Sequence, residues 1–342
     1  MHPVRAGYSP AMAREQVVVI TGASSGIGRD AALRFARRHA RLVLVSRRGR
    51  VLDDVAAECR RKGAAAAVAV AADISAEAEL QAVVDTAFAH FGRIDVWVNN
   101  AGVDGYGPLD RMTPDEIRRI FEVNAIGTAL GTRAALRAMK PAGRGTIVNV
   151  SSVLGEVPQP YAAVYSATKA SIRALSAAVR SELALEKHRH IHVSTVIPAT
   201  TDTPAYRHSA NRSDHRLRAM PPVYPVGSAG KAILRAAAKH PRETTANLAG
   251  TMFIPMHRLA PGLTEAELAQ LTQRTQFTRG RATGTSGNLF EPFPDADASV
   301  GGGWRGGSRQ AMSRLMLVAA VAVPLWWLFA KSAKQGKKGA RR

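Results

Sequence analysis

Short apolar runs alternate with longer alanine-rich segments over most of this 342-residue chain. Continuous apolar runs bounded by turn residues are typical of strands that are buried on both faces of a parallel sheet. The segments between them have the length and composition of helices, and together they predict an α/β fold with a doubly wound parallel sheet of about seven strands. The predicted strands are residues 16–20, 42–46, 67–71, 95–99, 146–150 and 192–197, with a weaker candidate at 244–248. The predicted helices include 29–39, 76–91, 115–139, 162–187 and 230–240.

The alternation divides the chain into four segments. Residues 1–13 form an N-terminal extension without the apolar stretch of a secretory signal, and residues 14–271 form the α/β domain. Residues 272–311 are rich in Gly, Ser, Thr and Asp, which predicts a disordered linker. Residues 312–342 contain an apolar run, 315–330, and a basic tail.

The charge of the chain is strongly positive, with 47 Lys and Arg against 26 Asp and Glu. Residues 301–342 contain nine basic residues and no acidic one, so they contribute +9 of the net +21. Basic residues on both sides of the apolar run 315–330 favour association with an anionic membrane, with the α/β domain facing the cytoplasm. The run has 16 residues, which is close to the lower limit for a transmembrane helix. It could therefore span the bilayer, dip into it or lie on its surface. The alternative is a cytoplasmic protein in which the run packs on the α/β domain.

Two other classes of function have little support in the composition. No zinc finger or basic surface interleaved with aromatic residues is apparent, so nucleic acid is not the expected partner. Cys59 is the single cysteine, which excludes an internal disulfide and a cysteine-built metal site. His188, His190 and His192 alternate without a carboxylate at ligand spacing, so we expect no metal.

A glycine-rich turn follows the first predicted strand and opens a helix. Glycines allow a sharp turn and a close approach of the backbone to a pyrophosphate, and the helix N-terminus supplies free N–H groups. The turn therefore predicts a Rossmann-type dinucleotide site. Its expected contacts are Gly22, Ser24, Ser25, Gly26, Ile27 and Gly28.

The second predicted strand ends at Arg47 and Arg48. An Asp or Glu at this place would bind the ribose of NAD, whereas a guanidinium pairs with the 2′-phosphate of NADP. The sequence predicts NADP(H) as the preferred cofactor, with NAD(H) as the alternative.

A reactive cluster is expected at the carboxyl ends of the middle strands. Tyr165 and Lys169 are four residues apart in a predicted helix, so their side chains share one face. A neighbouring ammonium would lower the pKa of the phenol and let it exchange a proton with an alcohol or a carbonyl. Ser152 and the run Asn100–Gly102 follow two predicted strands at the same edge, where open α/β sheets bind ligands.

With these motifs the sequence resembles the classical short-chain dehydrogenase/reductase family over residues 14–255. The resemblance rests on residues in the family's order and spacing: 21–28, Asp73, Asn100, Ala101, Gly102, Asn124, Ser152, Tyr165 and Lys169. It implies an NAD(P)-dependent oxidoreductase that interconverts a carbonyl and a secondary alcohol by hydride transfer. A lipophilic substrate would account for a membrane tether, and a catalytically silent dinucleotide-binding scaffold or redox sensor is the alternative.

The resemblance also implies a role for each of these residues. Tyr165 is the general acid/base, and Ser152 holds the substrate oxygen. Lys169 lowers the pKa of Tyr165 and binds the nicotinamide ribose, and Asn124 supports a water in the proton relay. Asp73 contacts the adenine, and Asn100, Ala101 and Gly102 pack beside the cofactor.

Three further expectations come from the family pattern. Pro198 and Thr203 agree with a cofactor-binding loop, but Ala199 stands where the family often has Gly, which would disfavour a positive φ there. Residues 199–224 occupy the place of the substrate loop, where His208 and His215 either orient a substrate or are solvated. A homodimer or homotetramer is expected through the helices around 115–139 and 162–187.

Overall fold

The central sheet has seven parallel strands in the structure, a computed structural model that describes residues 15–306. All strands expected from the sequence are present, which confirms the predicted doubly wound, Rossmann-type sheet. Their spatial order is β10 (Glu243–Thr245), β7 (Ile191–Ile197), β6 (Gly145–Val150), β4 (Val96–Asn99), β1 (Val17–Thr21), β2 (Arg41–Ser46) and β3 (Ala66–Ala71).

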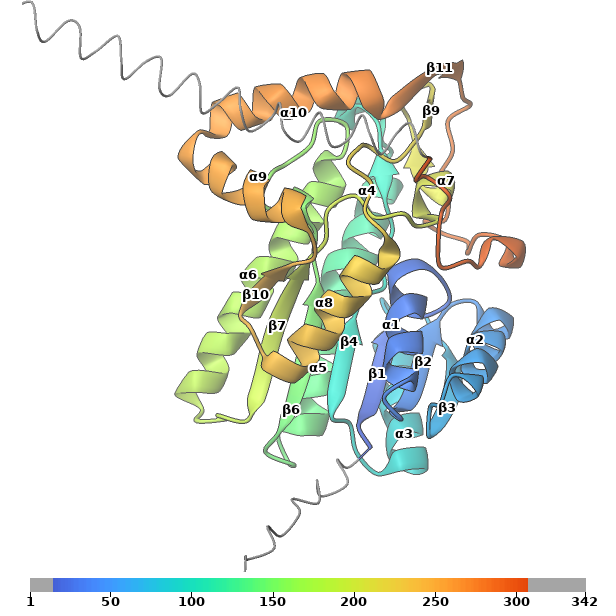
Figure 1. Ribbon diagram of the computed structural model, residues 1–342, viewed down its shortest axis with the longest axis vertical. Helices are drawn as coiled ribbons and strands as arrows, with labels where there is room; N and C mark the ends of the chain where they lie inside the picture. Colours follow the sequence, from blue (N-terminus) through green and yellow to red (C-terminus); the bar gives the residue numbers. More distant parts are fainter. Residues whose placement is uncertain (1–14, 307–342) are drawn as a thin grey trace, which may run out of the picture.

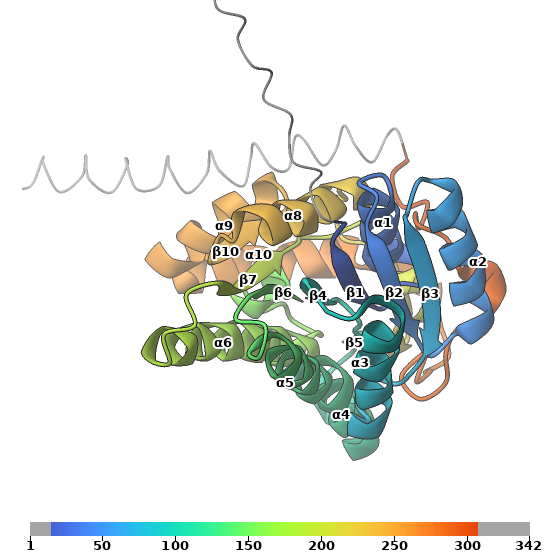
Figure 2. The same cartoon turned by 90° about the horizontal axis from the view of Figure 1, so that it is seen from below.

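Helices cover both faces of this sheet (Figures 1 and 2). One face carries α1 (Gly26–Ala36), α2 (Gly49–Arg61) and α8 (Val226–Lys239). The other carries α3 (Glu77–Phe91), α5 (Gly127–Met139) and α6 (Ala163–Leu185), with α4 (Pro114–Phe121) before α5.

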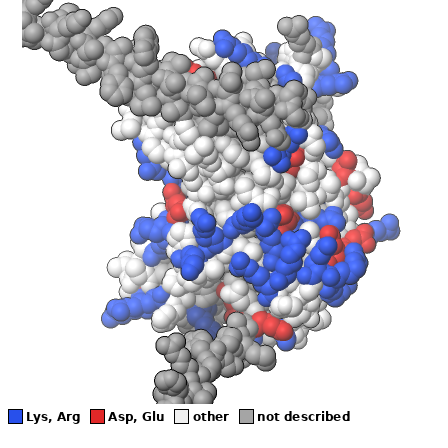
Figure 3. Space-filling view, viewed as in Figure 1, with Lys and Arg blue, Asp and Glu red and all other residues white. Residues whose placement is uncertain are grey.

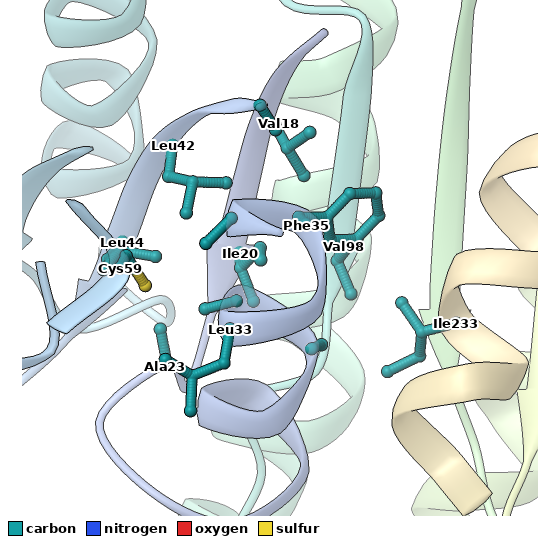
Figure 4. Close-up of a cluster of buried hydrophobic side chains, with 14 of the residues drawn as sticks. Val18, Ile20, Ala23, Leu33, Phe35, Leu42, Leu44, Cys59, Val98 and Ile233 are labelled. Carbon is teal, nitrogen blue, oxygen red and sulfur yellow. The ribbon is translucent and has the colours of Figure 1, made fainter. Parts of the chain in front are cut away.

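The strands are apolar along their whole length because successive side chains enter two different cores. Val18, Ile20 and Val98 point toward Leu33 and Phe35 of α1 (Figure 4). Their neighbours in sequence, such as Val19 and Trp97, are also fully buried but pack on the opposite face. Transfer of each such side chain from water stabilises the fold by roughly 1.5–3 kcal/mol before the entropy cost of ordering it.

The helix expected over 115–139 is interrupted. Thr113 and Glu116 form a reciprocal capping box at the start of α4, which ends at Phe121. A π-helical turn, η2 (Glu122–Ile126), follows and leads into α5. Single π-turns inside helices are frequent at functional sites, and this one contains Asn124.

Several short elements lie beyond the carboxyl ends of the strands (Figure 1). Strand β5 (Gly105–Tyr106) pairs with β8 (Ala210–Asn211), and β9 (His215–Leu217) pairs with β11 (Phe277–Arg281). Three helices complete this end of the molecule: α7 (Ala205–His208), α9 (Leu248–Leu259) and α10 (Pro261–Thr275). Three-residue 3₁₀ turns lie at Leu109–Arg111, Val153–Gly155 and Asp295–Asp297.

The prediction of a disordered linker over 272–311 is not met in the part that the structure describes. Helix α10 continues to Thr275, and β11 joins a two-stranded sheet. Residues 284–304, which we name the C-terminal strap, then run along the domain, with backbone N–H groups of Gly302 and Trp304 bound to Asp202. Composition alone did not reveal this packing because the strap is held mainly through its backbone, which any sequence provides.

Positive charge is not confined to the tail. Lys and Arg side chains gather over the face that carries α1, α2 and α8 (Figure 3). Among residues 15–306 no helix is long and apolar enough to cross a membrane. The N-terminal extension 1–13 and the predicted membrane-associating segment 312–342, with its apolar run 315–330, lie outside the described residues.

Candidate active site

The glycine-rich turn between β1 and α1 has the geometry that a dinucleotide requires. Gly22 and Gly26 have φ angles of +67° and +53°, in the left-handed region that favours glycine. At Gly28 a Cβ would lie 2.2 Å from the Gly22 carbonyl oxygen and 2.6 Å from Asn100 Nδ2. The turn can therefore close tightly on α1 only with glycine at these positions.

The ends of β1 and β4 are joined through Asn100. Its backbone N–H donates to Thr21 Oγ1 at 3.0 Å, and its side chain donates to the Thr21 carbonyl oxygen at 2.9 Å. The strand order reverses between these two neighbours, which is where doubly wound sheets form their ligand crevice.

A cavity of about 300 Å³ opens at this crevice and extends beneath α9 and α10. Among the residues predicted for the site, only Gly28 and Asn124 do not line it. Those that do are Gly22, Ser24, Ser25, Gly26, Ile27, Arg47, Arg48, Asp73, Asn100, Ala101, Gly102, Ser152, Tyr165, Lys169, Pro198 and Thr203. The structure thus brings the glycine-rich turn and the Tyr–Lys pair to one cavity.

Ser152, Tyr165 and Lys169 meet at the deep side of the cavity. Ser152 caps the turn after β6, where its Oγ accepts a hydrogen bond from the Leu154 N–H at 3.1 Å. Lys169 Nζ lies 5.5 Å from the centroid of the Tyr165 ring and donates to the Val150 carbonyl oxygen at 3.1 Å. Neighbouring turns of α6 hold both side chains beside the carboxyl end of β6.

The electrostatics of this group differ from the sequence-based expectation. Burial, followed by the negative charge of Asp104, raises the pKa of Tyr165 well above its ordinary value, and the neighbouring Ser152 side chain opposes this rise. The expected lowering by Lys169 is not among the effects on this pKa, although Lys169 Nζ lies 5.5 Å from the centroid of the Tyr165 ring. Burial lowers the pKa of Lys169 to about 8, against the opposing effect of Asp104.

Asn124 lies behind the cavity and is fully buried. Its Oδ1 accepts the Val103 N–H at 2.8 Å, and its Nδ2 donates to the Val103 carbonyl oxygen at 2.9 Å and to Thr168 Oγ1 at 3.1 Å. These bonds tie the loop after β4 to α6. The side chain of Asn124 is therefore a positioning group, and its predicted role in a water relay stays a prediction.

Arg47 and Arg48 line the cavity, but the C-terminal strap engages both. The Arg47 guanidinium donates to the carbonyl oxygens of Asn288, Leu289 and Phe290 at 2.7–3.2 Å. The Arg48 guanidinium contacts Pro294 and Asp295, and Phe293 stacks on it at 4.1 Å. The strap thus forms a wall of the cavity beside the end of β2.

Both carboxylate oxygens of Asp73, which was predicted to contact the adenine, already have partners within the protein. One carboxylate oxygen accepts from the Ser75 hydroxyl at 2.7 Å and from the Ser75 N–H at 3.0 Å, while the other pairs with Arg119. The hydrogen bonds to Ser75 and Arg119 hold its pKa below the ordinary value, against the opposing effect of burial. Its side chain fixes the loop after β3 at the rim of the cavity.

The loop after β7 lines the cavity as expected, although Ala199 stands where the family often has Gly. Non-glycine residues with positive φ in the described chain are His39, Tyr161, Lys187, Asp214 and His240, so Ala199 carries no such strain. The Pro198 carbonyl oxygen accepts the Val153 N–H at 2.9 Å, which joins this loop to the turn after β6.

The predicted substrate loop, residues 199–224, lines the cavity through Tyr206 and through Met220 to Pro222. His208 does not line it; its ring stacks on Phe293 at 4.2 Å instead. His215 is exposed in β9. In the described residues no group of three His, Cys, Asp or Glu side chains could hold a metal ion.

Three lining features were not predicted: Asp104, the pair Tyr106 and Tyr206, and the strap residues Asn288, Pro292 and Phe293. Asp104 could have been found from its position, because it lies two residues beyond Gly102 at the edge where the site was expected. The strap gives no comparable signal in the sequence.

Comparison with known proteins agrees with this geometry. The family model described as short chain dehydrogenase matches residues 16–214. The chain belongs to the short chain dehydrogenase family. It is 32% identical over 265 residues to the uncharacterized oxidoreductase YxnA of Bacillus subtilis, covering 76% of this chain and 71% of that protein.

Two solved structures of the family resemble the chain and differ in their nucleotide. A short-chain dehydrogenase/reductase of Burkholderia phymatum in complex with NAD has a TM-score of 0.67 and 25% identity, covering 73% of this chain and 95% of that one. A short-chain dehydrogenase of Sphingobium yanoikuyae in complex with NADPH has a TM-score of 0.61 and 33% identity, covering 72% and 94%. Family membership makes the protein an oxidoreductase that acts on CH–OH groups with a nicotinamide dinucleotide.

Proposed function

We propose that the protein is an NADP(H)-dependent reductase or dehydrogenase that interconverts a carbonyl and a secondary alcohol, with Tyr165 as general acid/base. The observation that carries this proposal is the shared cavity: Ser152, Tyr165 and Lys169 line it together with the glycine-rich turn at the start of α1. A substrate beside the nicotinamide would place its oxygen within reach of these side chains.

The residues present fit a dinucleotide. The turn has two glycines with positive φ, the α1 N-terminus faces the crevice, and Arg48 Nη1 is a buried donor without a hydrogen-bond partner among the described residues. We propose Gly22, Ser24, Ser25, Gly26 and Ile27 as the pyrophosphate cradle, with Asn100, Ala101, Gly102, Pro198 and Thr203 along the cofactor. Gly26 would contribute the left-handed turn, because its N–H donates to the Ser299 carbonyl oxygen. When bound, the cofactor supplies or accepts the hydride.

The protein's own residues handle the proton. Tyr165 would give its phenolic proton to the carbonyl oxygen during reduction and take it back during oxidation. Ser152 would donate a hydrogen bond to the same oxygen, and the Lys169 ammonium would stabilise the phenolate and bind the ribose. Asn124 fixes the loop after β4 next to this group.

NADP(H) is proposed over NAD(H) because Arg47 and Arg48 directly follow β2, and no carboxylate stands at that place in the sequence to bind a free ribose hydroxyl. The test is the ratio of the dissociation constants of NADH and NADPH. Replacing Arg48 with Ala should lower that ratio by about 10- to 100-fold, since a charge-assisted contact contributes about 1.5–3 kcal/mol. Arg50→Ala, an exposed residue of α2, is the matched control, and an unchanged ratio in Arg48→Ala would refute the assignment.

The activity itself is tested with a panel of ketones and secondary alcohols, supplied with NADPH and NADH in parallel, by following the absorbance of the reduced nicotinamide. Substrate-dependent turnover supports the proposal. Tight cofactor binding without turnover across the panel would instead favour a dinucleotide-binding scaffold or sensor.

Two proposals concern the surroundings of the enzyme. The apolar run 315–330 would associate with anionic membranes, which co-sedimentation of the full chain with phosphatidylserine vesicles tests against a chain ending at residue 311. Self-association would use the exposed side of η2 and α5, where Ile126 is 50% exposed, and light scattering measures the resulting mass.

A further inference from the structure

The loop after β4 places one carboxylate, that of Asp104, in the cavity that holds Ser152, Tyr165 and Lys169. No motif of the glycine-rich turn or of the Tyr–Lys pair requires an acid there. Asp104 is half-buried, and a carboxylate partly removed from water is stabilised by a hydrogen bond or an opposite charge.

The backbone of Asp104 is held from both sides. The preceding Val103 exchanges two hydrogen bonds with Asn124. The Asp104 carbonyl oxygen accepts the Ala210 N–H at 3.0 Å, and the next two residues form β5, which pairs with β8. The backbone that carries the carboxylate is therefore fixed in the cavity wall.

The groups around Asp104 compensate its charge only in part and do not supply a hydrogen-bond donor: burial raises the pKa of this carboxyl to about 6 against the opposing effect of Lys169. Lys169 is the cation that acts on it, yet Lys169 Nζ donates to the Val150 carbonyl oxygen. Tyr106 and Tyr206 lie next to it, with ring centroids 6.2 Å apart. Within residues 15–306 the carboxylate itself has no ion pair and no side-chain hydrogen bond.

Much of the remaining substrate side is apolar, although Gln159, Thr200 and Thr201 also line it. Val157, Met220, Phe253, Leu268 and Leu271 line the cavity beneath α9 and α10. Such a surface binds the hydrocarbon skeleton of a substrate. A polar group of the substrate that faced these residues would have no hydrogen-bond partner. Asp104 is the fixed acceptor that a second polar group of the substrate could reach.

We propose that Asp104 determines substrate specificity by accepting a hydrogen bond from a second hydroxyl group on an otherwise apolar substrate. The substrate class is then a hydroxy ketone and the corresponding diol. Lys169 already places a positive charge beside this carboxylate and would repel a substrate ammonium, so a neutral hydroxyl meets the need for a donor better than an ammonium group. This inference rests on the proposed function.

The test compares cyclohexanone with its monohydroxy and monoamino derivatives, using NADPH and the full-length protein. The wild-type protein should prefer one hydroxy derivative over cyclohexanone, with a ratio of their kcat/KM values of at least about 10. Asp104→Ala should lower this ratio by about 10- to 100-fold, as expected for a lost hydrogen bond to a charged group. Asp104→Asn keeps the shape and one acceptor oxygen, so its ratio should fall less. Asp110→Asn, an exposed acid of the same segment, should leave the ratio unchanged.

Three outcomes would overturn the inference: no preference for any hydroxy derivative in the wild-type protein, a preference for an amino derivative, or an equal loss for every ketone in Asp104→Ala. The last result would mean that Asp104 acts only through Lys169. Failure to oxidise NADPH with any ketone would contradict the proposed function instead, so the two failures are distinguishable. The near-isosteric Asn variant, checked by its thermal unfolding, keeps the test valid if Asp104→Ala does not fold.

Discussion

The C-terminal strap should loosen when the Phe293 ring is removed. That ring lies between two groups: the Arg48 guanidinium carbon is 4.1 Å from its centroid, and the His208 ring stacks at 4.2 Å with an interplanar angle of 7°. A cation–π contact contributes about 0.5–2 kcal/mol and an aromatic pair about 0.5–1.5 kcal/mol. Phe293→Ala should therefore weaken docking of the strap by about 1–3.5 kcal/mol, or about 5- to 300-fold in the docking equilibrium.

Hydrogen exchange reads this equilibrium directly, because three amide hydrogens are protected only while the strap is docked. The Gly26 N–H donates to the Ser299 carbonyl oxygen at 3.0 Å, the Gly302 N–H to the Asp202 carbonyl oxygen at 3.0 Å, and the Trp304 N–H to Asp202 Oδ1 at 2.8 Å. These amides should exchange about 5- to 300-fold faster in Phe293→Ala, while those of β1 keep their protection.

The matched control for this experiment is Phe290→Ala. Phe290 lies on the same strap, but its side chain is 47% exposed, so its removal should leave the exchange rates nearly unchanged. Wild-type rates in Phe293→Ala, or equal acceleration in both variants, would refute the role given to the Phe293 ring. A faster dissociation of NADPH in Phe293→Ala would link the strap to the cofactor cavity.

Two further predictions concern the core and the pH dependence. A Cβ at position 131 would lie 2.2 Å from Asn99 Oδ1, so Gly131→Ala should disturb the buried Asn99–Asn149 hydrogen bond. The free energy of unfolding in urea should fall by about 1–3 kcal/mol. Gly262→Ala is the control and should leave it unchanged, because a Cβ there meets nothing within 4 Å. Burial lowers the pKa of Lys169 to about 8, so kcat/KM for carbonyl reduction should fall as pH rises through about 8 and the ammonium is lost. Asp104→Asn removes a negative charge that raises this pKa, so the fall should occur at lower pH in the variant. Coincident pH profiles of the wild-type protein and the variant would contradict this prediction.

The sheet and most of the site could be predicted from the sequence for one physical reason. Strands buried on both faces are continuous apolar runs, and the carboxyl ends of parallel strands gather at one edge. Residues that directly follow such runs, such as Gly22, Asn100 and Ser152, are therefore expected to lie together on the strength of the pattern alone. Tyr165 and Lys169 followed from helical spacing.

The missed features lack a periodic signal. The π-helical turn Glu122–Ile126 interrupts a helix although none of its own residues is proline or glycine, and only Gly127 follows it. Tyr206 lies in a loop whose path depends on β5–β8 pairing, which is too short to show alternation. The glycine- and serine-rich composition of the strap predicted disorder. Its backbone is nevertheless ordered, because its carbonyl oxygens accept hydrogen bonds from the guanidinium groups of Arg47 and Arg48.

The central claim is that Tyr165 exchanges the proton with the substrate while other residues hold the cofactor. It is tested most directly by Tyr165→Phe, which removes only the phenolic oxygen. In a single turnover with a ketone of the panel, the oxidation of bound NADPH should slow by at least about 100-fold, while the dissociation constant of NADPH measured by fluorescence changes by less than about 3-fold. Oxidation at the wild-type rate in Tyr165→Phe would contradict the account.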